Sequence, residues 1–599
     1  MRSQLVYAAV AAILVPAAAI ATEDGPVRQP EVVVTARRMP TAVDQTLAAV
    51  SVITREQIEA SGTGDLLELL RSQAGIDIAR GGGIGQQTSV FLRGSASNHV
   101  TVLIDGVRVA ALSTGAYAFE HLPLDQVERI EIVRGPRAAL YGSDAIGGVI
   151  QIFTRRPGGI DASLVAGSHG TRGAAAGWGR RTSRGGFGLR AGILDSDGFS
   201  AQGPDGFAFD PDDDGFLSRH LSLDAHRDLG TQTVTFNALG LDDAVEFDQG
   251  RSDVRQHSAA ATLSGPLAPG WDHQLVLGQS RETLVTPDFF SRFDSRRAQL
   301  DWLHAVDVRS GSLMFGASVL DEHGVSIDTF SGTARFDVER DNRAAFVDWR
   351  GGAGAHDYEL AARYDDNSAF GGQSTFQGAW GWQPADDWRV FASYGEGFRA
   401  PNFNELYSPG FGGLFAGNPG LQAERSRSYE LGLKLAPGGE PQLGFHLFRT
   451  DIRDLIDFSG PQFMAINVRR ARIDGAELQW HRDLAEWRLD ASATWQQALD
   501  RDSGQRLLRR PDRKAALALA RSFGARLELG LEGYAASSRP EFGGALPGYG
   551  LLAVTARYRP VSRWTLGARI ENLLDRDYAL ARGFQTPGRT VMLRLHYQH

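Results

Sequence analysis

Hydrophobic side chains recur at every second position from about residue 158 onward. Leu431 and Leu433, for example, alternate with Gly432 and Lys434. Successive side chains of a β-strand point to opposite faces, so such a segment has one apolar and one polar face. The same alternation is found in residues 487–495, 564–571 and 591–597. The pattern predicts that this part of the chain consists of amphipathic β-strands.

Amphipathic strands suit either a soluble sandwich, which buries the apolar face, or a transmembrane barrel, which turns it to lipid. Aromatic residues stand at the ends of apolar faces, as Trp487, Trp564 and Tyr597 do, where a membrane-interface girdle needs them. Only a closed barrel leaves so large a sheet without exposed edges in lipid. We therefore predict a transmembrane β-barrel over residues 158–599. At roughly 20 residues per strand and connection, this length gives about 22 antiparallel strands, and 16–18 also fit.

Residues 41–157 lack this regular repeat. They combine a predicted helix, Arg55 to Arg71, with short strands such as Val100–Ile104 and Ile130–Val133, and glycine clusters separate these segments. We predict a compact N-terminal α+β domain. A barrel of about 22 strands has a lumen that leaks unless it is filled, so this domain is expected to lie inside the lumen.

The beginning of the chain has the features of an export signal. An apolar run of 17 residues follows Arg2 and ends in the small-residue pattern Ala19-Ile20-Ala21. This arrangement predicts a cleaved signal peptide over residues 1–21. Residues 22–40 would then form a tether in the exported compartment.

Composition excludes several classes of protein. The 62 Lys and Arg residues against 71 Asp and Glu residues give a net charge of −9, so no nucleic-acid-binding surface is implied. The absence of cysteine excludes disulfides, cysteine-bound metals and thiol nucleophiles. No apolar run after the signal segment approaches the ~18–20 residues of a membrane-spanning helix. No Ser/His/Asp set or carboxylate pair indicates an enzyme.

An acidic segment is the strongest candidate for a metal site. Residues Asp210–Gly215 have the spacing D-x-D-x-D-G, which places alternate carboxylates around a hard cation such as calcium. The twelfth position is Leu221, so the segment is not an EF-hand. A second acidic loop carries Asp248 and Asp253. The alternative is a solvated acidic loop, but so many carboxylates repel one another without a cation.

Three motifs resemble those of one protein family. Residues Glu31, Val32, Val33, Val34, Thr35 and Ala36 resemble a TonB box, residues 134–150 resemble a plug signature, and residues 571–578 resemble a C-terminal signature. On these motifs the chain resembles the TonB-dependent receptors of the bacterial outer membrane, and the resemblance covers essentially the whole chain after the signal segment. It departs from the family at its end, because it finishes on His599 where members usually have Phe.

The resemblance implies a barrel embedded in outer-membrane lipid, with the N-terminal domain as a plug, and transport rather than catalysis. An exposed β-prone segment such as the TonB box can add to a sheet edge of its partner, TonB, which would supply the energy. Within the family the chain is most similar to cobalamin receptors, so cobalamin or a related corrinoid is the implied ligand.

The resemblance also implies particular ligand and metal residues. Ala96 stands where the family has an Asn, and either Arg509 or Arg510 matches a barrel arginine that faces the ligand. The implied substrate-binding residues are Gln87, Ser89, Ala96, Ser113, Thr114, Arg509 and Arg510. The implied calcium ligands are Asp210, Asp212, Asp214, Phe247, Asp248 and Asp253.

Other functions are compatible with parts of the pattern. A ferric-siderophore receptor would share the plug and the barrel. A haem receptor is disfavoured, because residues 402–417 contain no His to bind the iron. A passive porin needs no N-terminal domain, so deleting residues 31–157 would leave its function intact. A surface adhesin would need a passenger domain, which we do not find.

Overall fold

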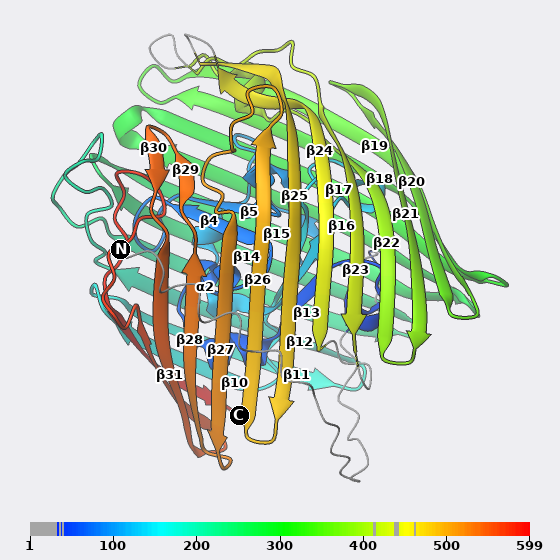
Figure 1. The fold of residues 1–599 in the computed structure, drawn as a ribbon, viewed down its shortest axis with the longest axis horizontal. Coiled ribbons are helices and arrows are strands. Elements are labelled where there is room, and N and C mark those ends of the chain that lie inside the picture. The colour runs from blue at the N-terminus through cyan, green and yellow to red at the C-terminus, as the bar shows by residue number, and fades with distance from the viewer. Residues whose placement is uncertain (1–32, 35–37, 39–40, 411–414, 437–441, 460–462) are drawn as a thin grey trace, which may run out of the picture.

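The computed structural model describes residues 33–34, 38, 41–410, 415–436, 442–459 and 463–599. The described residues form a closed antiparallel barrel of 22 strands with the N-terminal domain inside it (Figure 1), which confirms the predicted fold. Each barrel strand pairs with the barrel strands that precede and follow it in the chain, and the first of them closes the ring against the last, with Leu164 opposite Leu595. No helix in the described part of the chain is long and apolar enough to cross a membrane.

The barrel strands are β10 (Ile160–Gly167), β11 (Arg172–Thr182), β12 (Gly185–Ser196), β13 (Phe216–Leu229), β14 (Gln232–Phe247), β15 (Gly250–Ala268), β16 (Trp271–Thr286), β17 (Ser291–Val308), β18 (Gly311–Asp328), β19 (Thr333–Ala353), β20 (His356–Asn367), β21 (Gly371–Ala385), β22 (Trp388–Arg399), β23 (Glu424–Leu435), β24 (Leu443–Ser459), β25 (Met464–Leu484), β26 (Trp487–Asp500), β27 (Arg513–Phe523), β28 (Leu527–Ala536), β31 (Tyr549–Val561), β32 (Trp564–Glu571) and β33 (Thr590–Gln598).

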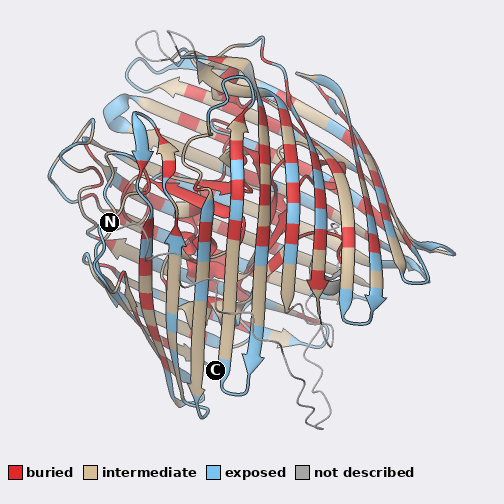
Figure 2. Cartoon of the chain, in the orientation of Figure 1, coloured by how far each residue is buried: buried red, intermediate tan, exposed pale blue. Residues whose placement is uncertain are grey.

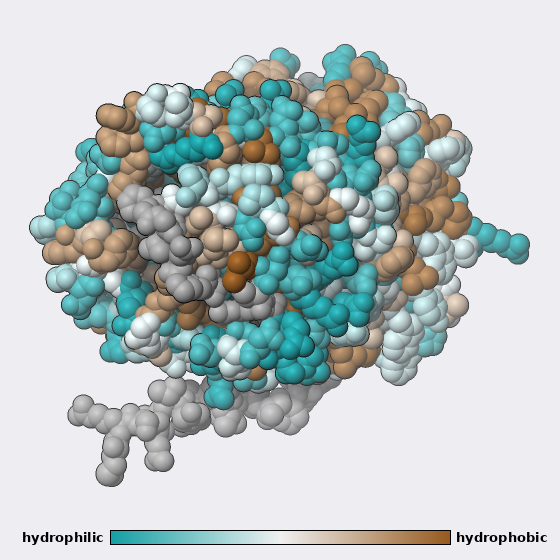
Figure 3. Space-filling model, turned by 90° about the horizontal axis from the view of Figure 1, so that it is seen from above, coloured by the Kyte–Doolittle hydropathy of each residue, from teal (hydrophilic) through white to brown (hydrophobic). Residues whose placement is uncertain are grey.

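The two ends of the barrel differ in the length of their connections. Tight turns such as residues 230–231 join strands at one end, here called the short-turn end. Segments such as residues 197–215 and 572–589 lie at the other, the long-loop end. The long-loop end also carries the helical turns η5 (Pro287–Phe289) and α4 (Phe403–Tyr407), and the hairpin of β29 (Arg539–Glu541) and β30 (Gly544–Leu546). Figure 3 looks down on this end, where hydrophilic residues predominate.

The predicted alternation separates the two faces of the barrel wall. On β23, Leu431 is 49% exposed on the outer face, whereas its neighbour Glu430 is buried toward the lumen. Figure 2 shows buried and exposed residues alternating along many strands. At the short-turn end, the ring of Trp564 packs against that of Tyr597 with a centroid distance of 5.0 Å. The outer wall therefore has the apolar face and the aromatic edge that a lipid environment favours.

The plug is built around a five-stranded sheet in the order β3-β8-β9-β6-β7 and a separate hairpin, β4-β5. Ile58, Ile130 and Ile152 are wholly buried in its core, which also reaches Leu239 and Leu241 of the barrel wall. The plug strands are β3 (Val50–Ile53), β4 (Ile76–Arg80), β5 (Thr88–Leu92), β6 (Val100–Ile104), β7 (Val107–Arg108), β8 (Val127–Arg134) and β9 (Gly148–Thr154). The helices are η1 (Val43–Gln45), α1 (Arg55–Ser61), α2 (Leu66–Arg71), η2 (Ser97–His99), η3 (Phe119–His121), η4 (Leu124–Gln126) and α3 (Ala138–Tyr141).

The single helix predicted over Arg55 to Arg71 was wrong, because two helices occupy this segment. Helix α1 ends at Gly62, whose φ of +64° is a left-handed conformation that suits glycine. The side chain of Asp65 then accepts a hydrogen bond from the backbone N–H of Leu67 and begins α2. The apolar spacing located the helical segment but not the break within it.

The N-terminal tether is described only in part. The backbone of Val33–Val34 (β1) pairs antiparallel with that of Thr41–Ala42 (β2). The predicted signal peptide lies outside the described residues, as do Glu31, Val32, Thr35 and Ala36 of the predicted TonB box.

Candidate functional site

Three plug segments, residues 81–87, 93–99 and 109–116, reach the long-loop end of the barrel. The first contacts the β14–β15 region, because the side-chain amide of Gln86 donates to the carbonyl oxygen of Glu246 at 2.5 Å. The third contacts the segment after β22, because the Asn402 side-chain amide donates to the carbonyl oxygen of Thr114 at 3.0 Å. The plug therefore forms the floor of the mouth that the barrel loops surround.

The structure places Gln87, Ala96, Ser113 and Thr114 in these three segments, and Ser89 in the adjoining strand β5. Gln87 and Thr114 are exposed, Ser89 and Ala96 are half-buried, and Ser113 is buried. The two later segments also lie close together. Gly115 has a φ of +73°, and a Cβ added there would lie 3.1 Å from the Cβ of Asn98.

Arg510 connects the barrel loop over residues 501–512 to the plug. Its Nε donates to the carbonyl oxygen of Gly94 at 2.9 Å and its Nη2 donates to that of Ser95 at 3.1 Å. Its guanidinium group lies 4.3 Å from the ring centroid of Phe91. Burial lowers the pKa of Arg510 to about 10. This side chain therefore lies directly beside Ala96, at the predicted ligand-binding face.

Arg509 has a different role from its neighbour. Its Nε donates to the carboxylate of Glu541 at 3.0 Å, and its backbone N–H donates to the carbonyl oxygen of Pro540 at 2.8 Å. It therefore anchors the β29–β30 hairpin, and of the two candidate arginines Arg510 contacts the plug.

The acidic loops meet around one short backbone segment. The backbone N–H of Ala201 donates to Asp214 Oδ2 at 2.5 Å, and that of Gln202 donates to Asp248 Oδ2 at 2.9 Å. The backbone N–H of Asp210 donates to the other carboxylate oxygen of Asp248, also at 2.9 Å. Both carboxylates are 4% exposed. The structure thus brings the carboxylates of Asp214 and Asp248 to one junction, which Asp210 joins through its backbone N–H.

Negative charge accumulates at this junction. Burial raises the pKa of Asp214 to about 6, and the nearby carboxylates of Asp248, Asp212 and Glu246 contribute to the shift. A bound cation would relieve this repulsion.

The remaining predicted metal ligands are not buried in this junction, although the charge of Asp212 contributes to the raised pKa of Asp214. Asp212 is exposed, and the ring of Phe247 stacks on that of Phe289. Asp253 faces outward on β15 and forms an ion pair with Arg251 at 2.7 Å. In the part of the chain that the structure describes, no group of three or more His, Asp or Glu side chains is arranged to hold a metal ion.

A buried ion cluster that the hydrophobic pattern does not reveal joins the plug to the barrel wall. Arg93 donates to both carboxylate oxygens of Glu430, at 3.1 and 3.2 Å. It also donates to both oxygens of Glu477, at 3.0 and 2.9 Å. Arg134, which is wholly buried, lies 3.8 Å from Glu477. The hydrophobic alternation assigns Glu430 to the polar face of its strand, but no local signal identifies a partner 337 residues away.

A second buried ion cluster lies beside it. His99 of the plug is 2.6 Å from Glu424 of β23, which also accepts a hydrogen bond from Arg399 Nε at 2.7 Å. Arg399 donates in addition to both carboxylate oxygens of Glu405 in α4. Because Ala96 lies between Arg93 and His99 in the chain, the predicted ligand-binding segment is held at both sides by buried charges.

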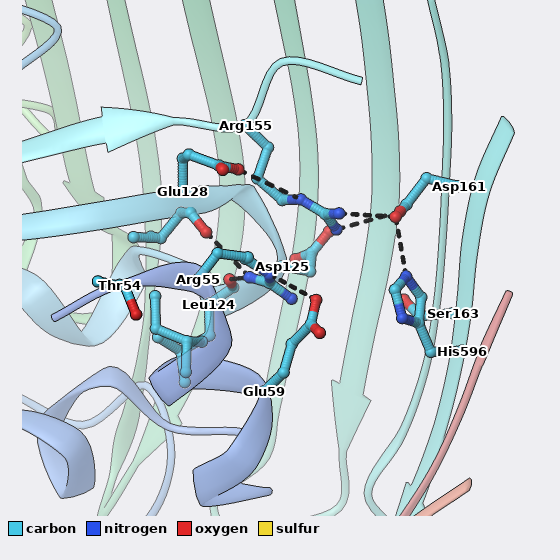
Figure 4. Close-up of polar contacts among 12 residues, drawn as sticks. Thr54, Arg55, Glu59, Leu124, Asp125, Glu128, Arg155, Asp161, Ser163 and His596 are labelled. Atoms are coloured by element: carbon cyan, nitrogen blue, oxygen red, sulfur yellow. Dashed lines mark hydrogen bonds and ion pairs between the residues drawn. The ribbon is translucent and has the colours of Figure 1, made fainter. Parts of the chain in front are cut away.

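The chain is also held where it leaves the plug and enters the barrel (Figure 4). Arg155 donates to both carboxylate oxygens of Asp161, at 3.1 and 2.6 Å. His596 of the last strand lies 2.8 Å from the same carboxylate. The C-terminal end of the plug is therefore fixed to the barrel wall by buried charges.

Two family models together match most of the chain. Residues 159–573 match the model described as TonB dependent receptor-like, beta-barrel. Residues 42–149 match the TonB-dependent Receptor Plug Domain.

Curated relatives match over the full length. The chain is 31% identical to the vitamin B12 transporter BtuB of Vibrio vulnificus, with 97% of this chain and 96% of that protein covered. It is 28% identical to the vitamin B12 transporter BtuB of Photobacterium profundum, with both chains covered completely. Among solved structures, the siderophore receptor PirA from Acinetobacter baumannii superposes with a TM-score of 0.78 at 17% identity, covering 93% of this chain and 99% of that one. At this identity the structural likeness shows the fold alone.

Proposed function

The chain belongs to the TonB-dependent receptors of the bacterial outer membrane, and on this premise we propose that it takes up cobalamin or a related corrinoid. The main support for the proposal is the similarity of the chain, over its whole length, to proteins named as vitamin B12 transporters. The arrangement of the plug supports the proposal, because the residues that the resemblance to cobalamin receptors implies as ligand contacts lie toward the long-loop end of the barrel. The proposal assigns transport, not catalysis, to the chain.

The proposed mechanism couples ligand binding to the position of the plug. A corrinoid at the mouth would contact the plug segment around Ala96 and the barrel side chain Arg510. This segment continues directly into Arg93 and His99, whose buried ion pairs hold the plug in the barrel. A ligand can shift the plug only by binding one of its arrangements more tightly than another. TonB would then pull on the N-terminal tether and supply the work of opening.

We propose calcium as a structural cofactor at the long-loop end. Asp214 and Asp248 would supply buried carboxylates, and Asp210 and Asp212 lie on the same loop as Asp214. A bound cation would fix the loop over residues 197–215 to the β14–β15 turn. The observation in support is the accumulation of carboxylates around Asp214, which raises the pKa of that group.

Uptake in cells tests the proposed function. The gene would be expressed in a strain that lacks its own cobalamin receptor, and the uptake of radiolabelled cyanocobalamin would be measured with and without active TonB. We expect TonB-dependent accumulation. A ferric-siderophore receptor is the second candidate, but it is supported only by structural likeness at 17% identity, as to PirA. Accumulation of ferric siderophores without cyanocobalamin would favour it.

A further inference from the structure

A wide cavity separates part of the plug from the barrel wall. It holds about 440 Å³ and lies mainly between the plug helices α1 and α2 and the wall strands β24 to β28, β31 and β32. Along β28 its lining extends from Glu528, next to the short-turn end, to Tyr534, two residues before the strand ends. In Figure 1 the strands β26 to β28 stand in front of the plug. This hollow, here called the lateral cavity, therefore extends over most of the height of the wall.

Short side chains on the inner face of the wall produce the lateral cavity. On β27, Ala516 and Ala518 point inward, because they follow Lys514, which contacts the plug, at every second position. Gly530 of β28 and Ala553 of β31 line the same space. Protein interiors are close-packed and leave few voids larger than a water molecule. The plug and the wall are therefore not packed against each other in this sector.

Elsewhere apolar contacts join the plug to the wall. Leu140 of α3 shares a buried cluster with Phe346 of β19, and Ile146 shares one with Phe448 of β24. A narrower hollow of about 250 Å³ along β14 to β20 borders the first of these clusters, because Tyr141 belongs to both. Within the described part of the chain, no buried hydrophobic cluster joins the plug to β27, β28, β31, β32 or β33. The apolar contacts that hold the plug therefore do not include these strands.

Hydrogen bonds join the plug to the wall at the lateral cavity. Arg569 of β32 donates to the carbonyl oxygen of Ser61 at 2.7 Å. Lys514 of β27 donates to the carbonyl oxygen of Gln73 at 3.0 Å. Water can replace such bonds when the two surfaces separate, whereas separated apolar surfaces are left in unfavourable contact with water. The plug therefore comes away from the wall more easily here than at its apolar clusters.

A group of aromatic and charged side chains closes the lateral cavity toward the long-loop end. The guanidinium group of Arg71 lies 4.9 Å from the ring centroid of Tyr534 and donates to Glu571 at 3.2 Å. The ring of Tyr549 lies 5.8 Å from that of Tyr534 and stacks on that of Tyr578 at 4.7 Å. We call Arg71, Tyr534, Tyr549 and Tyr578 the tyrosine gate.

The ligand contacts proposed above lie over the same strands that line the lateral cavity. Arg510 stands three residues before β27, and it donates to the carbonyl oxygen of Gly94. A Cβ added at Gly94 would lie 3.4 Å from the Cβ of Ala498 on β26. A ligand bound at Ala96 and Arg510 is therefore above β26 and β27, whose lower parts line the lateral cavity.

We propose that the ligand crosses the barrel along this sector, between the plug helices α1 and α2 and the strands β26 to β32, while the plug stays joined to the rest of the wall. The inference rests on the proposed function and adds the route of transport. Polar side chains such as Gln57, Gln479 and Ser492 line the cavity and suit a solute rich in amide groups, as a corrinoid is. The cavity is smaller than a corrinoid, so α1 and α2 have to move and the tyrosine gate has to open.

Disulfide locks test the route, because the chain contains no cysteine of its own. A Cβ added at Gly62 of the plug would lie 3.5 Å from the Cβ of Arg569, a separation that a disulfide can span. Gly62→Cys with Arg569→Cys would be expressed in a strain without its own cobalamin receptor. Uptake of labelled cyanocobalamin would be measured in oxidised cells and again after reduction. We expect oxidation to abolish uptake and reduction to restore it, with binding at the cell surface unchanged.

The matched control locks the plug to a strand outside the lateral cavity. A Cβ added at Gly395 of β22 would lie 3.7 Å from the Cβ of Pro136. Pro136→Cys with Gly395→Cys leaves α1 and α2 free, so its uptake should be the same before and after reduction. If both locks abolish uptake, the plug moves as a whole and the proposal is overturned. Normal uptake with the lock between positions 62 and 569 closed would also overturn it.

Ion conductance in planar bilayers tests the route without a corrinoid. Tyr534→Ala with Tyr578→Ala removes two rings of the tyrosine gate, so it should join the lateral cavity to the mouth and pass a current that the wild type does not. Adding Ala518→Trp, which fills the cavity, should reduce this current. The control is Tyr394→Ala with Tyr429→Ala, because these two rings lie 5.3 Å apart on the outer wall. It should conduct no more than the wild type.

The two measurements separate the route from the identity of the ligand. If the wild type does not accumulate cyanocobalamin, the proposed function fails and the conductance decides the route. The absence of a current in the gate variant, or a current that Ala518→Trp leaves unchanged, would overturn the route whatever the ligand is.

Discussion

Arg93 of the plug is joined to Glu477 of the barrel wall by two hydrogen bonds of 2.9 and 3.0 Å, although 384 residues separate them in the chain. Both side chains are almost completely buried, at 4% and 1% exposure. Charges so far from water need partners, and the pair therefore holds the plug in one position in the lumen. Because Arg93 begins the segment that carries Ala96, the proposed ligand contact and this buried pair are part of one piece of the plug.

Glu477→Gln should destabilise the plug without preventing assembly of the barrel. Removing one partner of a buried ion pair costs about 3–5 kcal/mol, because the remaining charge is left uncompensated. The free energy of plug unfolding would be measured by urea titration with a fluorophore on the plug. Glu486→Gln, in an exposed turn at the short-turn end, is the matched control and should change little. Equal effects of the two variants would contradict the proposed role of Glu477.

Val33→Pro should abolish uptake while ligand binding at the cell surface persists. Proline removes a backbone N–H and fixes φ, so the tether can no longer add as a regular strand to a partner sheet. Val33→Thr keeps the N–H and the β-propensity and should transport normally. Labelled cyanocobalamin would be followed separately as bound and internalised ligand. Normal uptake by the proline variant would refute coupling through this segment.

The contact between His121 and Asp243 should make the stability of the plug depend on pH. The His121 ring lies 2.9 Å from the Asp243 carboxylate. Burial alone lowers the pKa of His121, but the hydrogen bond to Asp243 and the charges of Glu120, Asp243 and Glu282 outweigh it, so the pKa lies above its ordinary value. The folded state therefore holds the proton more tightly than the unfolded state.

The stability that this contact contributes is complete below about pH 6.5 and is lost as the pH rises through the raised pKa. Thermal unfolding of the plug from about pH 5.5 to 8.5 would be compared between the wild type and His121→Gln. The wild type should lose more stability across this range than the variant. Parallel pH profiles would show that this histidine does not contribute.

Calcium should raise the affinity for corrinoid, and by reciprocity corrinoid should raise the affinity for calcium. A cation that orders the acidic loops would lower the loss of conformational entropy that accompanies corrinoid binding. Magnesium should substitute poorly, because it requires tight octahedral geometry and releases its waters reluctantly. Asp212→Asn with Asp214→Asn should remove the calcium effect and leave barrel folding unchanged.

The measurement is the affinity for corrinoid in millimolar calcium and in chelator, made on the wild type and on this double variant. If wild-type affinity is the same in calcium and in chelator, the segment is a solvated acidic loop.

The hydrophobic pattern predicts the barrel because burial alternates with a period of two, as between Leu431 and Glu430. It does not predict which inward charges meet, since the pairing of Glu430 with Arg93 depends on where the plug lies in the closed ring. Asp253 was grouped with the metal ligands, but its position on β15 places it on the outer face, away from Asp214. Spacing in the sequence therefore does not identify the partners of a charged residue, because the strand register decides which face of the wall it lies on and which residues are opposite.

The central claim is that this receptor recognises a corrinoid, and equilibrium binding tests it most directly. Purified protein in millimolar calcium would be titrated with cyanocobalamin, ferric enterobactin, ferripyoverdine and haem, with Arg510→Ala as a variant at the mouth. We expect cyanocobalamin to bind far more tightly than any iron compound, and Arg510→Ala to weaken that binding. Tight and selective binding of a ferric chelate, with no binding of cyanocobalamin, would contradict the claim.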